Sequence, residues 1–282
     1  MINLARAFTY ALPLGLALTA GALAQQPQAA PSVNTEPLAR KVINNYVRPA
    51  YAQLSDTAEA LKSEIAGFCM APSAAARSAI NSAFERALLA WSGAEMIRFG
   101  PVLTANAHDR FAFWPDEKGL GLKQINAVLA ARDETAATTD ALSGKSVAVQ
   151  GFTALEYLLY GAGADGLLAA TDEGRYRCRF ASAIAGNIAS LAEQVKAAWA
   201  DDAAFPATLL SPKPEHPLYK SSRDVKLELF KAFTTGLQHI RDVKLARVLA
   251  DNPQNAQPKR APYWRSVLTF KVIEANLEAL ET

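Results

Sequence analysis

Apolar residues spaced three and four positions apart recur through almost the whole chain after residue 36. This spacing places them on one face of an α-helix. No stretch of useful length alternates apolar and polar residues in the way of a half-buried strand. Long helical segments joined by short polar loops are typical of up-and-down bundles. The sequence therefore predicts an all-α fold built from helical bundles.

Local signals bound several of these helices. A first helix is expected from Pro37, with a kink at Pro49 because proline has no amide hydrogen to donate. Ser73 is a predicted N-cap for the second helix. Later helices are expected over residues 122–132, 146–160, 171–201, 222–250 and 262–280. The helix over 222–250 has the clearest apolar seam, formed by Val225, Leu229, Phe233, Leu237 and Ile240.

Residues 1–24 have the composition of a cleavable signal peptide. Arg6 precedes an apolar run over residues 7–18, and Ala22, Leu23 and Ala24 fit the small-x-small rule for cleavage before Gln25. The run is shorter than the roughly 20 apolar residues of a membrane span. Because the residue after the cut is not cysteine, no lipid anchor is expected there. We therefore expect a periplasmic protein that is not a lipoprotein and has no transmembrane segment in the mature chain.

Residues 25–36 are rich in Gln, Pro, Ala and Ser, which predicts a disordered leader. Threonines and alanines crowd around residues 135–145, so the remainder is divided there into an N-terminal bundle (37–140) and a C-terminal bundle (141–282). The net charge of +2 is nearly balanced. Such a balance gives no electrostatic reason to expect a nucleic-acid partner.

Cys69 and Cys178 are the two cysteines of the chain. In an oxidising compartment they are candidates for a disulfide. A bridge between them would close a loop of about 109 residues, for which the chain-entropy model gives about 4–5 kcal/mol of stabilisation. Two buried free thiols are the alternative, and the sequence leaves both open.

The familiar catalytic motifs are absent from the sequence. It has no His-Glu-x-x-His, Cys-x-x-Cys or Gly-x-Ser-x-Gly motif and no phosphate-binding loop. His108, His216 and His239 are scattered along the chain. A conventional zinc hydrolase is therefore not expected.

Glu156 is the single charge in the apolar helical segment over residues 150–161. Burying an ionised carboxylate costs several kcal/mol unless a partner compensates it. Glu156 should therefore face a cation, a hydrogen-bond cluster or a wet cleft, with Thr153 one turn before it on the same face. The alternative is a structural ion pair that lowers the carboxyl pKa. Three arginines are available for such a pair: Arg98, Arg110 and Arg265.

Two other stretches are candidates for the same cleft. Glu95 and Arg98 continue the helix face that carries Trp91, unless that helix end emerges into solvent. Residues 110–116 mix aromatic bulk with charge, as loops that shape pockets do, although such loops also fill gaps between bundles.

Residues 151–159 resemble the imelysin-like family of exported bacterial proteins (peptidase M75-like). The resemblance extends to residues 91–101, 113–116 and 260–265, and so covers nearly all of the mature chain. It implies a fold of two four-helix bundles with a site in the groove between them. The family is associated with bacterial iron uptake, and its founding member was described as a metallopeptidase.

The family motif is Gly-x-His-x-x-Glu. This chain has Gly151 and Glu156 but carries Thr153 at the histidine position, which marks a divergent branch. Histidine and glutamate three apart on a helix can chelate a metal, whereas a neutral hydroxyl is a poor ligand for transition metals. The substitution favours a non-catalytic protein over an enzyme.

These features predict a non-catalytic component of iron or other divalent metal acquisition, acting with periplasmic or outer-membrane uptake proteins. Glu156 is the expected acceptor and metal ligand. The other expected site residues are Gln150, Gly151, Thr153, Arg98, Arg110, Trp114 and Asp116. The alternatives are a binding protein for a small anionic or saccharide ligand, which would use the arginines and tryptophans, and a metallopeptidase with His108 as a ligand.

Overall fold

A computed structural model describes residues 34–169 and 171–282. Every regular element in these residues is helical and they contain no strand, which confirms the all-α prediction. None of the described helices is long and apolar enough to cross a membrane. The predicted signal peptide and residues 25–33 of the predicted leader lie outside the described residues. The division into bundles at residue 140 stays a prediction.

The α-helices are joined by short 3₁₀ turns and interrupted by two π-helical segments, η1 and η6. In chain order the elements are α1 (Glu36–Val42), η1 (Ile43–Val47), α2 (Arg48–Met70), α3 (Ala74–Ala94), η2 (Gly100–Asn106), α4 (Ala107–Phe111), α5 (Leu120–Ala131), η3 (Glu134–Ala136), α6 (Thr139–Ser143), η4 (Val147–Val149), α7 (Gly151–Tyr160), η5 (Ala164–Leu168), α8 (Asp172–Ala197), α9 (Ala204–Leu210), α10 (Ser222–Gln238), η6 (His239–Ala246), α11 (Arg247–Leu249), η7 (Pro253–Asn255), η8 (Pro258–Arg260) and α12 (Thr269–Glu281).

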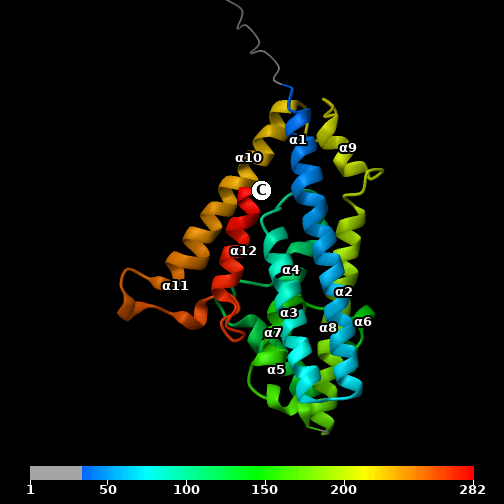
Figure 1. Cartoon of the computed structure of the whole chain (residues 1–282), viewed down its shortest axis with the longest axis vertical. Helices are drawn as coiled ribbons and strands as arrows, with labels where there is room; N and C mark the ends of the chain where they lie inside the picture. The colour runs from blue at the N-terminus through cyan, green and yellow to red at the C-terminus, as the bar shows by residue number, and fades with distance from the viewer. Residues whose placement is uncertain (1–33, 170) are drawn as a thin grey trace, which may run out of the picture. The chain divides into compact units, whose positions relative to one another are not determined.

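The long helices α2, α3 and α8 form the centre of the fold, and α2 packs against both of the others (Figure 1). Buried residues of α2 recur at three and four positions, which gives the helix a continuous apolar face. Many buried positions of α8 are alanine or glycine, so neighbouring helices can approach it closely. The shorter α7 packs on α8, and α12 packs on α3.

The predicted caps and the predicted proline disturbance are visible at the helix ends. Ser73 Oγ accepts a hydrogen bond from the Ala76 amide at 3.1 Å, which confirms it as the N-cap of α3. Pro49 lies in the first turn of α2, directly after the π-helical segment η1. A π-helical turn is a common consequence where the regular hydrogen-bond ladder is broken.

The predicted helix over 262–280 begins seven residues late, at Thr269. Tyr263 and Val267 have left-handed backbone φ angles of 55° and 62°, so the intervening chain is a turn. The Ser266 amide, which a helix would use internally, donates instead to the carboxylate of Glu156. A tertiary hydrogen bond therefore displaces the helix start.

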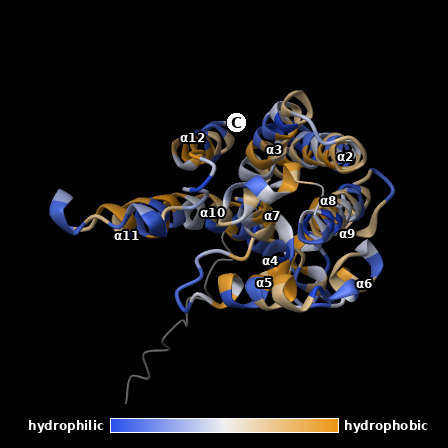
Figure 2. Cartoon of the chain, turned by 90° about the horizontal axis from the view of Figure 1, so that it is seen from below, coloured by the Kyte–Doolittle hydropathy of each residue, from blue (hydrophilic) through white to orange (hydrophobic). Residues whose placement is uncertain are grey.

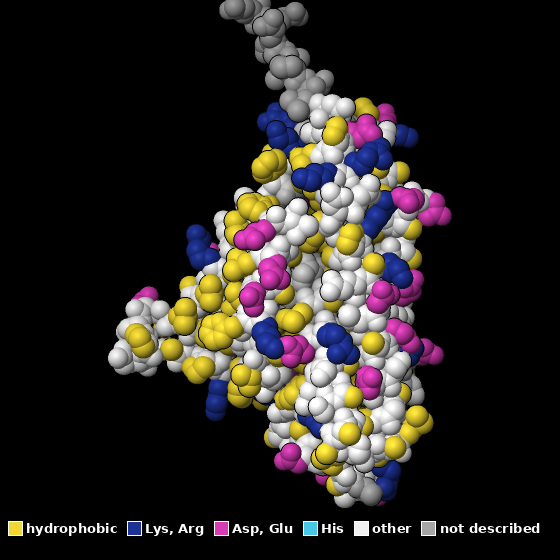
Figure 3. Space-filling view, viewed as in Figure 1, with side chains coloured by type: hydrophobic (Ala, Val, Ile, Leu, Met, Phe, Trp, Pro, Cys, Tyr) yellow, Lys and Arg dark blue, Asp and Glu magenta, His cyan; other side chains and the backbone are white. Residues whose placement is uncertain are grey.

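The apolar seam predicted for the helix over residues 222–250, which the structure divides into α10, η6 and α11, is only partly buried. Val225 and Ile240 are buried, but Phe233 and Leu237 are 43% and 41% exposed. Figure 2 shows α10 and α11 extending away from the central helices, with α12 beside α3. Apolar side chains consequently gather on the surface of this part of the molecule (Figure 3).

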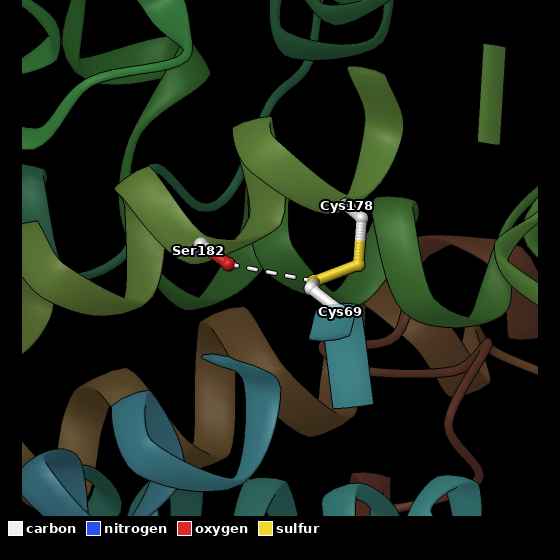
Figure 4. The surroundings of a disulfide bond; sticks show 3 residues. All are labelled: Cys69, Cys178 and Ser182. Atoms are coloured by element: carbon white, nitrogen blue, oxygen red, sulfur yellow. Dashed lines mark hydrogen bonds between the residues drawn. A yellow bond between two sulfur atoms is a disulfide. The ribbon is translucent and has the colours of Figure 1, made fainter. Parts of the chain in front are cut away.

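Cys69 and Cys178 form a disulfide bond that joins the last turn of α2 to α8 (Figure 4). Their Cα atoms are 5.7 Å apart. The Cys69 sulfur also lies 3.5 Å from Ser182 Oγ on the next turn of α8. The bond therefore links two helices of the central group across a sequence separation of 109 residues.

The start of α7 is fixed by Gly151, whose φ of 72° lies in the left-handed region. A Cβ atom at this position would collide with the backbone carbonyl oxygens of Arg110 and Phe111. Beside it, the fully buried Gln150 accepts hydrogen bonds from Arg110 Nε at 3.1 Å and from Asn187 Nδ2 at 2.8 Å. Arg110 also donates to Asn187 Oδ1 at 2.9 Å. This closed polar triad holds α7 against α4 and α8.

A second buried polar cluster holds η6 and α12 against the end of α3. Lys244 Nζ donates to Glu95 Oε2 and to Asn276 Oδ1, both at 2.6 Å. Asn276 Nδ2 in turn donates to the Ser92 carbonyl at 2.6 Å. Burial alone would raise the pKa of Glu95, but Lys244 and His239 lower it more, so the net pKa shift is strongly downward. Glu95 is therefore an ionised, compensated core residue.

Removing the disulfide should destabilise the fold. We expect the Cys69→Ser, Cys178→Ser double variant to lose up to about 4–5 kcal/mol of unfolding free energy, because its unfolded chain regains the entropy of a long loop. Urea denaturation of the oxidised protein measures this. Reductant should lower the stability of the wild type and leave the variant unchanged. Equal stability of the two oxidised proteins would contradict the prediction.

Gly151→Ala should cost about 3 kcal/mol or more of unfolding free energy, because the left-handed backbone penalty adds to a clash with rigid carbonyl oxygens. Gly119→Ala is the matched control. Gly119 has a similar φ of 63°, but nothing lies within 4 Å of the added Cβ. That variant should lose only about 1–2 kcal/mol in the same denaturation assay. Similar losses for both would show that the Gly151 contact is soft.

Replacing only one partner of the Glu95–Lys244 ion pair should lower the unfolding free energy strongly. Lys244→Met leaves a buried carboxylate uncompensated and should lose about 3–5 kcal/mol, as should Glu95→Leu, which strands the lysine. The double variant should lose much less than the sum, and a double-mutant cycle measures that coupling. Because the pKa of Glu95 is lowered, its contribution is complete above its ordinary value of 4.5 and is lost on acidification below it. Additive single losses would contradict the pairing.

Candidate functional site

A cavity of about 210 Å³ lies over one face of α7. Three stretches of chain form most of its walls: residues 113–125, the turn of α7 over residues 153–157, and the segment 247–265. These stretches come from both sides of residue 140. The side chains that matter for its chemistry are Trp114, Asp116, Glu117, Thr153, Glu156, Tyr157, Arg247, Lys259, Arg260, Tyr263, Trp264 and Arg265.

Glu156 lines this cavity although it is only 2% exposed. Its Oε1 atom accepts two hydrogen bonds, from the amide and from the hydroxyl of Ser266, both at 2.9 Å. Both of these hydrogen bonds fall on Oε1, and the backbone amide of Arg265 also interacts with the carboxylate. Within the described residues, no arginine or lysine side chain forms an ion pair with it.

Burial raises the pKa of the Glu156 carboxyl above its ordinary value. The two hydrogen bonds from Ser266, the positive charge of Arg265 and the Arg265 backbone amide oppose this rise in pKa without cancelling it. The carboxyl therefore takes up a proton at a pH at which an exposed glutamate has lost it. It can act as an acceptor when ionised and share a proton when not.

Two hydroxyl groups lie beside Glu156. The Thr153 Oγ1 atom is buried and makes no hydrogen bond of normal geometry within the described residues. It nevertheless faces the hydroxyl of Tyr263. Burial raises the pKa of Tyr263 well above its ordinary value, and the interaction with Thr153 opposes this rise. The floor of the cavity therefore combines one carboxylate with neutral hydroxyls.

The rim carries more positive than negative charge. Arg247 forms an ion pair with Glu117 at 2.7 Å. Asp116 accepts hydrogen bonds from the Leu120 and Gly121 amides at 2.8 and 2.7 Å, which satisfies the first turn of α5. The other three cations of the lining form no ion pair with a carboxylate of the described residues: Lys259, Arg260 and Arg265.

Aromatic rings hold part of this positive charge in place. The Arg265 guanidinium lies 4.4 Å from the ring centre of Trp264 and 5.3 Å from that of Tyr157. Lys259 Nζ lies 5.9 Å from the Trp264 ring centre. Such cation–π contacts orient a cation without neutralising it.

The structure brings together four of the eight predicted ligand-binding residues: Trp114, Asp116, Thr153 and Glu156 line the cavity. The other four lie outside its lining. Gln150, Gly151 and Arg110 form the contacts that start α7. Arg98 lies in the Glu95 cluster, 3.4 Å from His239 Nε2.

His108, the expected ligand of a metallopeptidase, is also outside the lining and packs on Trp91 with ring centres 5.2 Å apart. Ser266, which holds Glu156, was not predicted. Its role depends on a turn that periodicity assigned to a helix, so the sequence carries no local signal for it.

The side chains of the cavity do not fit a bare metal ion held by the protein alone. Protein metal sites use several carboxylate, imidazole or thiolate ligands. Across residues 34–169 and 171–282, no three or more His, Cys, Asp or Glu side chains come close enough to share one ion. Glu156 offers a single oxygen, with cations on the rim.

Comparison with solved structures finds the same fold in other proteins. A chain from Psychrobacter arcticum, an imelysin-like protein, aligns with a TM-score of 0.69 and 19% identity over 88% of this chain and 72% of its own. A candidate iron-regulated protein A precursor from Parabacteroides distasonis aligns with a TM-score of 0.73 and 12% identity over 90% of this chain and 74% of its own. At these identities the likeness establishes the fold. No curated protein matches the sequence.

The family model described as Imelysin (peptidase M75) matches residues 47–282, which include α7, the cavity and both buried polar clusters. That match spans most of the sequence. The chain therefore belongs to the imelysin family.

Proposed function

We propose that this protein is a non-catalytic periplasmic component of iron or other metal acquisition that binds its ligand in the Glu156 cavity. The observation that carries the proposal is that both hydrogen bonds from Ser266 reach the same oxygen of the Glu156 carboxylate. Ser266 binds Oε1 through two hydrogen bonds, and no side-chain cation of the described residues pairs with the carboxylate. A carboxylate that lines a cavity without an ion-pair partner can accept a charge-assisted hydrogen bond from a ligand, which contributes to affinity.

Family membership supports the metal part of the proposal. One solved relative carries the name of a candidate iron-regulated protein A precursor. The composition of residues 1–24, which is typical of an exported protein, supports the periplasmic location. In this location the protein would receive or deliver its ligand through other periplasmic or outer-membrane uptake components.

The non-catalytic part follows from the side chains around Glu156. Thr153 occupies the position at which the family motif has a histidine, and the threonine hydroxyl is neutral. His108 packs on Trp91 away from the cavity lining. The cavity thus offers acceptors, hydroxyls and fixed cations, a set suited to holding a ligand.

A second candidate function uses the same cavity. A binding protein for a small anionic or saccharide ligand is favoured by the three rim cations without ion pairs and by the Trp264 and Tyr157 rings. The two functions are compatible where the metal arrives together with an anion.

Replacing Glu156 tests the proposal. The purified protein is titrated by calorimetry with ferrous, cupric and zinc salts and with ferric citrate, and a deletion strain is complemented in iron-poor medium. We expect Glu156→Gln to weaken binding of the preferred iron form at least tenfold and to lower growth, because the acceptor oxygen is lost. Glu59→Gln, on the exposed face of α2, is the matched control.

Circular dichroism and urea denaturation separate this effect from misfolding. Binding of no iron form, together with unchanged growth of the Glu156→Gln strain, would overturn the proposed function. Recovery of the protein in the cytoplasmic fraction of the native host would overturn its periplasmic part.

A further inference from the structure

We propose that the ligand of the Glu156 cavity is a small hydroxycarboxylate anion, taken up free or as its metal chelate, and that Lys259, Arg260 and Arg265 recognise its carboxylates. This inference deepens the proposed function and rests on it, because it names what occupies the same cavity. It makes the anion, and not a bare metal ion, the group that the protein contacts.

Charge on the rim supports an anion. The lining has four cations and three carboxylates, and two of those carboxylates are already engaged. Glu117 pairs with Arg247, and each oxygen of Asp116 accepts a hydrogen bond from a backbone amide. The remaining cations therefore present their charge to whatever enters. A bare cation entering here would meet repulsion from the rim before it reached Glu156.

The geometry of the cations suits planar carboxylates. Arg265 is held between the Trp264 and Tyr157 rings, which leaves the edge of its guanidinium available for hydrogen bonds. A guanidinium with a fixed orientation binds a carboxylate through two parallel hydrogen bonds. Lys259 and Arg260 are exposed beside it on one short turn, η8, so they can contact further carboxylates of the same molecule.

The floor of the cavity calls for a donor on the ligand. When Glu156 is ionised, its second oxygen can accept a hydrogen bond from the ligand, and an ionised carboxylate ligand has no donor to offer. A hydroxyl group supplies that donor. The ligand should therefore carry carboxylates toward the rim and at least one hydroxyl toward Glu156, Thr153 and Tyr263.

The size of the cavity restricts the ligand further. A volume of about 210 Å³ is below the usual range for drug-sized ligands. It admits a compact polycarboxylate more readily than an oligosaccharide or a peptide. Hydroxycarboxylates are also chelators of hard metal ions through their oxygens. A chelate would carry the metal ligands that the described residues lack.

The test uses citrate, ferric citrate and tricarballylate, which is citrate without its hydroxyl group, titrated by calorimetry into the full protein. We expect citrate or ferric citrate to bind, and tricarballylate to bind at least tenfold more weakly because it leaves the Glu156 oxygen unpaired. The Lys259→Gln, Arg260→Gln double variant should weaken binding roughly tenfold. Lys62→Gln, an exposed lysine of α2, is the matched control and should leave affinity unchanged.

Raising the ionic strength should weaken binding to the wild type more than to the double variant, since rim charge is screened. Arg265→Lys keeps the positive charge but loses the paired N–H donors of the guanidinium. Its affinity for citrate should therefore lie between that of the wild type and that of Arg265→Gln.

The outcomes separate this inference from the proposed function. If ferrous or zinc salts bind and neither citrate form does, the inference is overturned and the proposed function stands. Equal binding of citrate and tricarballylate, or no effect of the double variant, also overturns the inference. If free citrate binds and ferric citrate does not, the anion is supported and the role in metal acquisition fails.

Discussion

The backbone of Gly151 lies directly against the carbonyl oxygens of Arg110 and Phe111, and this contact determines where α7 begins. It leaves no room for a side chain and requires a left-handed φ, so α7 starts at one residue and in one direction. The polar triad of Arg110, Gln150 and Asn187 then fixes the rotation of the helix. With start and rotation set, Glu156 and Tyr157 line the cavity, whereas Leu155 is fully buried in the core.

The wall opposite α7 depends on the same carboxylate. The amide and the hydroxyl of Ser266 both donate to Glu156, and the chain bends around this contact, with left-handed φ angles at Tyr263 and at Val267. Trp264 and Arg265 belong to that bend and therefore take their positions from it. Glu156 thus has a structural role through Oε1, beside the ligand-binding role proposed for it. Loss of its contact with Ser266 would also displace Trp264 and Arg265 from the cavity wall.

The helical core could be predicted because it is encoded locally. Periodic burial in α2, the Ser73 cap of α3 and the position of Glu156 as the single charge of its segment all follow from neighbouring residues. The start of α12 could not be predicted, since a tertiary hydrogen bond to Glu156 outweighs the helical preference of residues 262–268. The exposure of Phe233 and Leu237 could not be predicted either, because periodicity identifies an apolar helix face but not which element packs on it.

The candidate site shows the same limit. Gln150, Gly151, Arg98 and Arg110 have the residue types of a binding site, and their sequence neighbourhood gives no sign that they are structural. Their partners, Asn187 and His239, are far away in the sequence. Conversely, Ser266 and the unpaired rim cations become recognisable only once residues 113–125, α7 and 247–265 are brought together.

Threonine at position 153 is consistent with an anionic ligand on electrostatic grounds. A histidine there, three residues before Glu156, would add a metal ligand to the floor of the cavity and favour a bare cation. The threonine hydroxyl adds no charge and no strong metal donor. The four cations of the lining outnumber its three carboxylates, and burial raises the pKa of one of these, Glu156, which supports the proposed anionic ligand. In such a cavity any metal must bring its own ligands.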